Sequence, residues 1–219
     1  METWHATRRT RAVVLVLHGG AEAGLSEVRP WGLAYLRMLP VARALHRACG
    51  RHGVEVRLVR NRVRGWNEPE LHPVVDARWA LEEIRATRPG VPVFVVGHSM
   101  GGRVALRVAD DPAVTAVCAL APWTPDGEPV EGVRGRDVVI AHGVHDRITK
   151  PAESFAYAVQ ARRSAARIVR YEVLAEGHAM VRRPGVWNRL ICAFTLDAAG
   201  VAALPAWSSA AGRRLRLPV

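Results

Sequence analysis

The ten residues from Val93 to Gly102, Val-Phe-Val-Val-Gly-His-Ser-Met-Gly-Gly, constrain the fold more than any other part of the chain. Residues 93–96 form a short apolar run with β-branched side chains, typical of a strand buried on both faces of a parallel sheet. Residues 97–101 fit the pattern Gly-x-Ser-x-Gly, and residues 103–109 have the apolar spacing of a helix. A strand, a glycine-flanked serine and a helix in this order predict a sharp turn that presents Ser99 as a nucleophile.

Steric crowding explains the two glycines of this pattern. A sharp strand-to-helix turn is strained, and a side chain at Gly97 or Gly101 would collide with the neighbouring backbone. The helix that follows points its free N–H groups and the positive end of its dipole at the turn. We therefore expect negative charge that develops beside Ser99 to be stabilised there.

The rest of the chain alternates between apolar runs and helical patterns. Buried strands are expected at 12–17, 54–59, 93–96, 114–120, 138–141 and 168–173. Helices are expected at about 30–52 with a break at Pro40, and at 74–87, 103–109, 151–163 and 186–198. This alternation predicts an α/β fold with a mostly parallel sheet of about six to seven strands and helices on both faces.

The length of 219 residues predicts a single domain, which we place at 1–207. Residues 208–219 are small, basic and weakly patterned, so we expect a loosely packed C-terminal tail. No apolar stretch reaches the ~20 residues of a membrane span, and we expect no transmembrane segment. The three cysteines, an odd number in apolar or helical contexts, predict reduced, buried side chains in a cytoplasmic protein.

The charge is strongly positive, with 31 basic and 20 acidic residues and a net charge of +11. Such a balance can indicate nucleic acid, an anionic membrane or an acidic substrate as a partner. Lys150 is the only lysine, however, and the arginines are scattered in short groups without an interleaved aromatic stripe. We expect no nucleic-acid partner, because no binding motif accompanies the charge.

In a parallel sheet, functional groups gather at the carboxyl ends of the strands. Among the residues that follow the predicted strands are Ser99, Asp146 and His178, in this order along the chain. A serine nucleophile needs a base to take its proton, and the base needs a carboxylate to orient it. Asp126, after the preceding strand, is the alternative carboxylate.

Several other polar side chains sit near these strand ends. His142 and His145 could bind a metal together with Asp146, but no second cluster supplies a fourth ligand, so no metal is expected. We expect His18 and His98 to shape their turns by hydrogen bonding.

These motifs together resemble the α/β-hydrolase family over nearly the whole chain. The matching stretches are Gly97–Gly101, His142–Thr149 and Gly177-His178. The resemblance implies Ser99 as nucleophile, His178 as base and Asp146 as the acid that orients the base. It also implies an oxyanion hole from the N–H of Met100 and one N–H of the His18-Gly19-Gly20 loop, for which Gly20 is preferred and Ala21 is the reserve. No cofactor is implied.

The gap between the strands at 114–120 and 138–141 departs from many relatives, which insert a lid or cap there. Residues 122–137 are too few for a helical cap domain and leave only a small flap. We expect an open site that favours small or medium esters, with Ala21, Trp66 and Trp123 as candidate substrate-binding residues.

The sequence thus predicts a serine hydrolase that cleaves small-molecule carboxylic esters or thioesters through an acyl-enzyme. One alternative keeps the fold and uses it for acyl transfer, amide or carbon–carbon bond cleavage, or perhydrolysis. Another is a non-catalytic member that binds anions or partners through its arginine-rich surface.

Overall fold

The structure is a computed structural model, and it describes residues 1–208 and 215–219. Its centre is an eight-stranded sheet in the order β1-β3-β2-β4-β5-β6-β7-β8. Among the described residues, only β1 runs antiparallel to its neighbour, and the other strand pairs are parallel. The predicted fold class, a mostly parallel sheet without a separate cap domain, is therefore confirmed for the described residues. The strands are β1 (Glu2–Trp4), β2 (Ala12–Leu17), β3 (Val54–Leu58), β4 (Val93–His98), β5 (Val114–Leu120), β6 (Asp137–Gly143), β7 (Arg167–Val173) and β8 (Leu217–Pro218).

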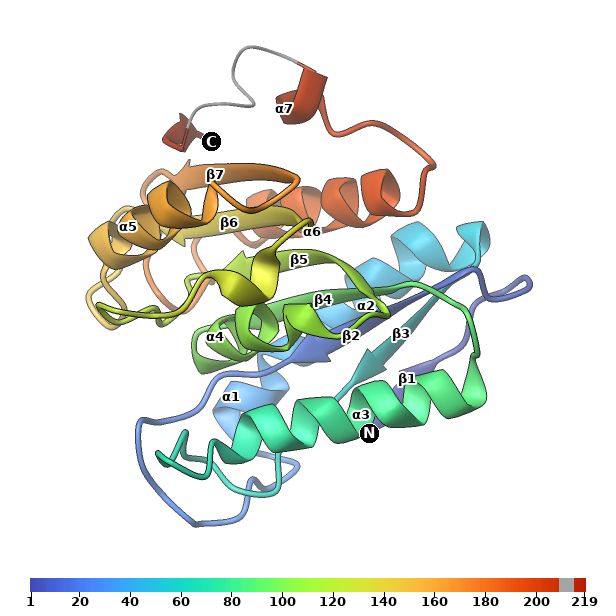
Figure 1. Cartoon of the computed structure of the whole chain (residues 1–219), viewed down its shortest axis with the longest axis horizontal. Helices are drawn as coiled ribbons and strands as arrows, with labels where there is room; N and C mark the ends of the chain where they lie inside the picture. The colour runs from blue at the N-terminus through green and yellow to red at the C-terminus, as the bar shows by residue number, and fades with distance from the viewer. Residues whose placement is uncertain (209–214) are drawn as a thin grey trace.

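Helices cover both faces of the sheet (Figure 1). On one face, α1 (Leu33–Leu36), α2 (Met38–Cys49) and α6 (Pro184–Ala198) enclose one apolar core. On the other, α3 (His72–Thr87), α4 (Met100–Arg107) and α5 (Pro151–Ala161) enclose a second. The short α7 (Pro205–Ser208) follows α6. Strands β2 and β4 to β6 are buried on both faces, which explains their continuous apolar sequences.

The helix break was predicted at the wrong residue. The chain interrupts its helix at Arg37, between α1 and α2, and Pro40 lies in the first turn of α2. A proline is tolerated there because the first N–H groups of a helix have no partner within it.

The sheet has two edge strands that the apolar pattern did not predict. Trp4 pairs with Val56 at one edge, and Leu217 pairs with Tyr171 at the other. The expectation of a loosely packed segment at 208–219 is therefore wrong for residues 215–219, where Leu215 is buried. Residues 209–214, also within that segment, lie outside the described part of the chain.

The cysteines are unpaired, as expected, but they are not equally buried. Cys49 and Cys118 are buried, whereas Cys192 is half-buried. Within residues 1–208 and 215–219, no helix is both long enough and apolar enough to cross a membrane.

Candidate functional site

Ser99 lies at the junction of β4 and α4, in the middle of the sheet's carboxyl edge. Its φ of 58° and ψ of −122° are strained for a residue with a side chain. Its carbonyl accepts hydrogen bonds from the N–H groups of Gly102 at 2.9 Å, Arg103 at 3.2 Å and Trp123 at 3.1 Å. The first turn of α4 and the loop after β5 thus hold the strained serine in place.

The two glycines of the turn lie where no side chain fits. A Cβ atom on Gly97 would lie 2.0 Å from the carbonyl oxygen of Gly101. A Cβ atom on Gly101 would lie 2.5 Å from the carbonyl oxygens of Leu17 and His18. The crowding predicted from the sequence is confirmed, and it arises because α4 packs directly on the ends of β2 and β4.

Ser99, His178 and Asp146 form one hydrogen-bonded chain. Ser99 Oγ lies 3.0 Å from His178 Nε2, and His178 Nδ1 lies 2.8 Å from Asp146 Oδ2. Asp146 follows β6 and His178 follows β7, so the ends of three strands, β4, β6 and β7, each supply one residue at the carboxyl edge. In this arrangement His178 can accept the serine proton while Asp146 fixes the tautomer of its ring.

The carboxylate of Asp146 is buried and fully hydrogen-bonded. Its Oδ1 accepts the N–H groups of Ile148 at 2.8 Å and Thr149 at 3.0 Å, and its Oδ2 lies 3.2 Å from His142 Nε2. Burial alone would raise the pKa of Asp146, but the hydrogen bonds from His142, His178 and Ile148 outweigh it and hold the pKa below its usual range. Asp146 is therefore ionised at neutral pH.

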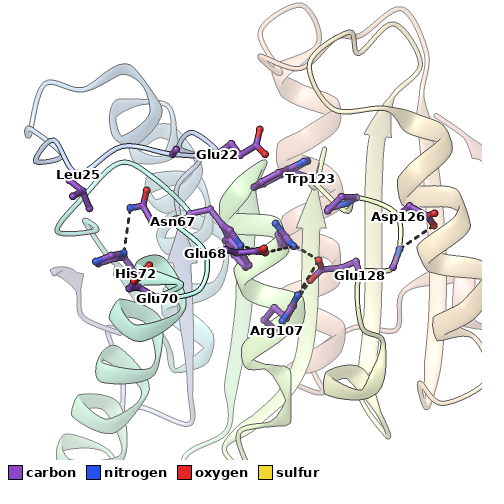
Figure 2. Close-up of a pocket in the computed structure, with 15 residues that line it drawn as sticks. Glu22, Leu25, Asn67, Glu68, Glu70, His72, Arg107, Trp123, Asp126 and Glu128 are labelled. Carbon is purple, nitrogen blue, oxygen red and sulfur yellow. Dashed lines mark hydrogen bonds and ion pairs between the residues drawn. The ribbon is translucent and has the colours of Figure 1, made fainter.

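Asp126 does not take part in this chain. Its side chain is exposed and accepts a hydrogen bond from the N–H of Gly127 at 3.1 Å. Figure 2 shows it at the far end of its loop, away from Trp123.

His98 connects the serine turn to the loop that carries His178. Its Nε2–H donates to the backbone carbonyl of His178 at 2.9 Å, while its buried Nδ1 has no partner among the described residues. Burial and the neighbouring His178 ring lower the pKa of His98 to about 3, so its ring is neutral.

His18 organises the loop on the other side of Ser99. Its Nδ1–H donates to the carbonyl of Gly19 at 2.6 Å, and its Nε2 accepts the N–H of Asn61 at 3.0 Å. Burial lowers the pKa of His18, which keeps the ring neutral for both bonds. Hydrogen bonding by His18 and His98, expected from the sequence, is confirmed.

Gly20 and Met100 lie against each other beside Ser99. A Cβ atom on Gly20 would lie 2.4 Å from Met100 Cε and 2.3 Å from the carbonyl oxygen of Arg64. Met100 begins α4, so its N–H lacks a partner within the helix. The N–H of Ala21 already donates to Arg64 at 2.9 Å, which removes Ala21 as the reserve oxyanion donor.

A cavity of about 970 Å³ lies beside α4 and the loop after β5. Ser99 and His178 are not among its lining residues, but Trp123, which lines it, donates its N–H to the carbonyl of Ser99.

Trp66 and Trp123 both line the cavity, and their rings meet edge to face with centroids 6.1 Å apart. Their role in substrate binding stays a prediction. Trp66 is buried, whereas Trp123 is half-buried. Ala21 is not among the lining residues; its neighbours Glu22 and Ala23 are.

An arginine and a glutamate that the sequence analysis missed shape this cavity (Figure 2). The Arg103 guanidinium lies 4.0 Å from the ring centroid of Trp66 and 4.5 Å from that of Trp123. Arg103 Nε donates to Glu128 at 2.6 Å, and Arg107 also donates to Glu128. These bonds fasten residues 122–130, which we call the flap, to α4. The sequence contained a signal for Arg103, because it lies four residues after Ser99, about one helical turn away. No comparable signal in the sequence pointed to Glu128.

The alternative metal site is not assembled in the described residues. His142 lies near Asp146, but His145 is exposed, and no group of three His, Cys, Asp or Glu side chains is placed to bind a metal ion in this part of the chain.

Comparisons with known proteins concern the family and the fold of the chain. The model of the alpha/beta hydrolase family matches residues 13–218. A search of curated proteins finds no match. Among solved structures, the chain resembles a putative alpha/beta hydrolase from Agrobacterium tumefaciens, with 12% identity, 93% coverage of both chains and a TM-score of 0.72.

Two further structures share the fold at similarly low identity. A serine hydrolase without a lid from Xanthomonas campestris is 18% identical, with 93% of this chain and 88% of that chain covered and a TM-score of 0.66. An esterase from Pyrococcus furiosus is 16% identical, with 86% and 82% covered and a TM-score of 0.67.

Proposed function

We propose, because the chain belongs to the alpha/beta hydrolase family, that it is a serine hydrolase that cleaves carboxylic esters or thioesters through an acyl-enzyme on Ser99. The observation that carries the proposal is the hydrogen-bonded chain from Ser99 Oγ through His178 to Asp146, with distances of 3.0 and 2.8 Å. Both distances lie in the range that proton transfer requires.

In the first step, Ser99 Oγ attacks the substrate carbonyl carbon and His178 Nε2 takes the hydroxyl proton. The ionised Asp146 holds the Nδ1–H of His178 and stabilises the imidazolium that forms. The carbonyl oxygen gains negative charge, and the N–H groups of Gly20 and Met100 donate to it.

In the second step, the carbon–oxygen or carbon–sulfur bond to the leaving group breaks and His178 returns its proton to that group. The acyl group remains on Ser99 as an ester. A water molecule then releases the acyl group by the same two steps. His178 takes a proton from the water, and the hydroxide adds to the acyl carbon. Ser99 then leaves and receives the proton from His178.

The two sides of the site receive different parts of the substrate. The leaving group must lie beside His178, because that residue protonates it. The acyl group then points away from His178, towards the cavity of about 970 Å³ lined by Trp66 and Trp123. Without a cap the cavity is open to solvent, which supports small or medium esters as substrates.

Hydrolysis of a chain-length series of p-nitrophenyl esters, and of matched thioesters, tests this proposal. We expect turnover by the wild-type protein, labelling of Ser99 by a fluorophosphonate, and loss of both in Ser99→Ala. Inertness towards every ester and thioester, together with absence of labelling, would overturn it. The thioester series separates the two substrate classes.

A further inference from the structure

Large apolar side chains are exposed near His178, and none of them lines the cavity beside Trp66 and Trp123, which we call the acyl cavity because the proposed function places the acyl group there. They come from three separate segments: the loop and helix after β2, the loop after β6, and the loop after β7. Their exposed fractions are high for such residues, at 66% for Trp31, 78% for Leu33, 74% for Ile148 and 67% for Val181. With Leu36, at 38%, we call these five residues the apolar face.

Two grooves join these segments into one surface. The first, of about 480 Å³, is lined by Leu33 and Leu36 of α1 and by Val181. The second, of about 610 Å³, is lined by Ile148, His178 and again Val181. Because Val181 belongs to both, the apolar side chains form a continuous band that passes beside His178. Trp31 lies two residues before Leu33, next to the start of α1.

The charge around the apolar face is positive. Arg37, Arg147 and Arg182 line the two grooves, and Arg29 lies over the ring of Trp31 at 5.6 Å. The described lining residues of both grooves include one acidic side chain, Glu176. It is buried, and its carboxylate accepts hydrogen bonds from Gly177, Arg183 and Trp187.

The acyl cavity has the opposite character. Five acidic side chains line it: Glu22, Glu68, Glu70, Asp126 and Glu128. Arg103, Arg107 and the exposed Leu25 line it as well, so acidic side chains outnumber arginines there by five to two. The excess of positive charge therefore lies on the side of the two grooves. An anionic surface with an apolar interior matches both properties of that side, and a purely electrostatic partner would match only one.

We propose that the apolar face adsorbs to anionic lipid membranes. Trp31, Leu33, Leu36, Ile148 and Val181 enter the boundary between headgroups and acyl chains, and the surrounding arginines contact lipid phosphates. Adsorption needs no chemistry at Ser99, so it stands apart from the proposed hydrolysis. If the proposed hydrolysis also holds, a membrane ester reaches the site from the side on which His178 protonates the leaving group.

Co-sedimentation of full-length Ser99→Ala protein with vesicles tests the proposal without turnover. We expect binding to vesicles of phosphatidylcholine with phosphatidylglycerol, little binding to phosphatidylcholine alone, and weakening by salt. Adding Trp31→Ala and Leu33→Ala should lower the partition coefficient about tenfold or more, because two apolar anchors are lost. Replacing Arg29 or Arg182 by alanine should lower it about fivefold each.

The matched control is Trp79→Ala with Val159→Ala in the same background. Trp79 on α3 and Val159 on α5 are 48% and 47% exposed, and they lie over the opposite face of the sheet from α1. Both double variants keep the net charge, so general attraction by the +11 chain affects them equally. We expect the control to bind as the parent does.

Three outcomes would overturn the proposal: absence of binding to anionic vesicles, equal loss of binding in both double variants, or binding that only the charge variants change. The last would identify a purely electrostatic partner, such as an acidic polymer. Thermal unfolding of each variant distinguishes lost binding from lost folding.

Discussion

The Nε2–H of His98 donates to the backbone carbonyl of His178 at 2.9 Å across 80 residues of sequence. The residue that precedes the nucleophile thus fixes the backbone of the proposed base. The rings of the two histidines lie 4.8 Å apart, and His98 is completely buried. His98 is therefore a positioning residue for the proposed Ser99–His178 pair, although it touches no substrate.

Removal of this bond should lower turnover without changing substrate affinity. In His98→Ala, we expect kcat to fall about tenfold or more with KM nearly unchanged, because small displacements of a catalytic group are costly. His98→Gln, whose amide can donate to the same carbonyl, should recover part of the loss. Steady-state kinetics on a p-nitrophenyl ester measures both, and wild-type kcat in both variants would contradict the role.

The neutral, buried His98 also predicts how stability depends on pH. Its pKa is lowered to about 3 in the folded protein, from an ordinary value of 6.5. Between these values the unfolded chain binds a proton that the folded chain does not. The free energy of unfolding should therefore fall as pH falls below 6.5, by about 1.4 kcal/mol per pH unit from this residue.

Urea unfolding of wild type and His98→Gln between pH 4.5 and 8 measures this effect. Below pH 6.5, the slope of the free energy of unfolding against pH should be smaller in the variant by about 1.4 kcal/mol per pH unit, which is the contribution of one proton. His18 and Asp146 also have lowered pKa values in the folded protein, so they too make stability fall as pH falls. Both proteins retain these two residues, so the difference between the two slopes reports on His98. Identical slopes would show that His98 does not titrate as proposed.

The two candidate carboxylates can be separated by a matched pair of substitutions. Asp146→Asn should lower kcat/KM by about 10³- to 10⁴-fold, because the amide favours the wrong tautomer of the base. Asp126→Asn should leave turnover nearly unchanged, since Asp126 is exposed and bonded only to its own loop. A larger effect at Asp126 would reverse the assignment of the acid.

A methyl group at Gly20 should impair the proposed oxyanion hole. The Cβ of Gly20→Ala would lie 2.3 Å from the Arg64 carbonyl oxygen, so the loop must move away from Ser99. We expect kcat to fall about 10²-fold, the cost of losing one oxyanion donor. Gly185→Ala is the control, since its nearest atom is the end of the Arg189 side chain at 3.6 Å. Unchanged kcat in Gly20→Ala would place the donor elsewhere.

The buried ion pairs that hold the flap should be important for stability. Glu128 and Arg103 have side chains only 1% and 6% exposed, so Glu128→Gln removes the buried counter-ion of Arg103. The guanidinium then keeps only its longer contact with the exposed Glu68, at 3.4 Å. We expect a loss of about 3–5 kcal/mol in the free energy of unfolding, measured in urea. Glu153→Gln, which breaks the exposed pair with Lys150, should cost less than about 1 kcal/mol. Equal losses of unfolding free energy in Glu128→Gln and Glu153→Gln would show that burial of the Glu128–Arg103 pair does not matter for stability.

The sequence predicted the parts of the fold whose local pattern is strong. The runs at 12–17 and 114–120 match β2 and β5 residue for residue, because strands covered by helices on both faces are mostly apolar. The short edge strands at Glu2–Trp4 and Leu217–Pro218 carry no such pattern. Their pairing depends on a neighbouring strand that is distant in sequence.

The same distinction holds at the site. Ser99, Asp146 and His178 follow predicted strands, so their shared position at the carboxyl edge could be anticipated. The contacts of His98 with His178, and of Arg103 with Glu128, join segments that nothing in their local sequence relates. Such contacts can be identified only from the three-dimensional structure, in which the order and register of the strands are known.

The hydrogen bond from the N–H of Trp123 to the carbonyl of Ser99 has a consequence for protein engineering. The flap that borders the acyl cavity also supports Ser99, the proposed nucleophile. We therefore expect a redesign that shifts the backbone at residue 123 to lower activity as well as change selectivity. Pro125 and Asp126 also line the cavity but lie farther along the flap. A library that varies these two side chains and preserves residues 121–124 would alter the range of accepted acyl groups while leaving the nucleophile undisturbed.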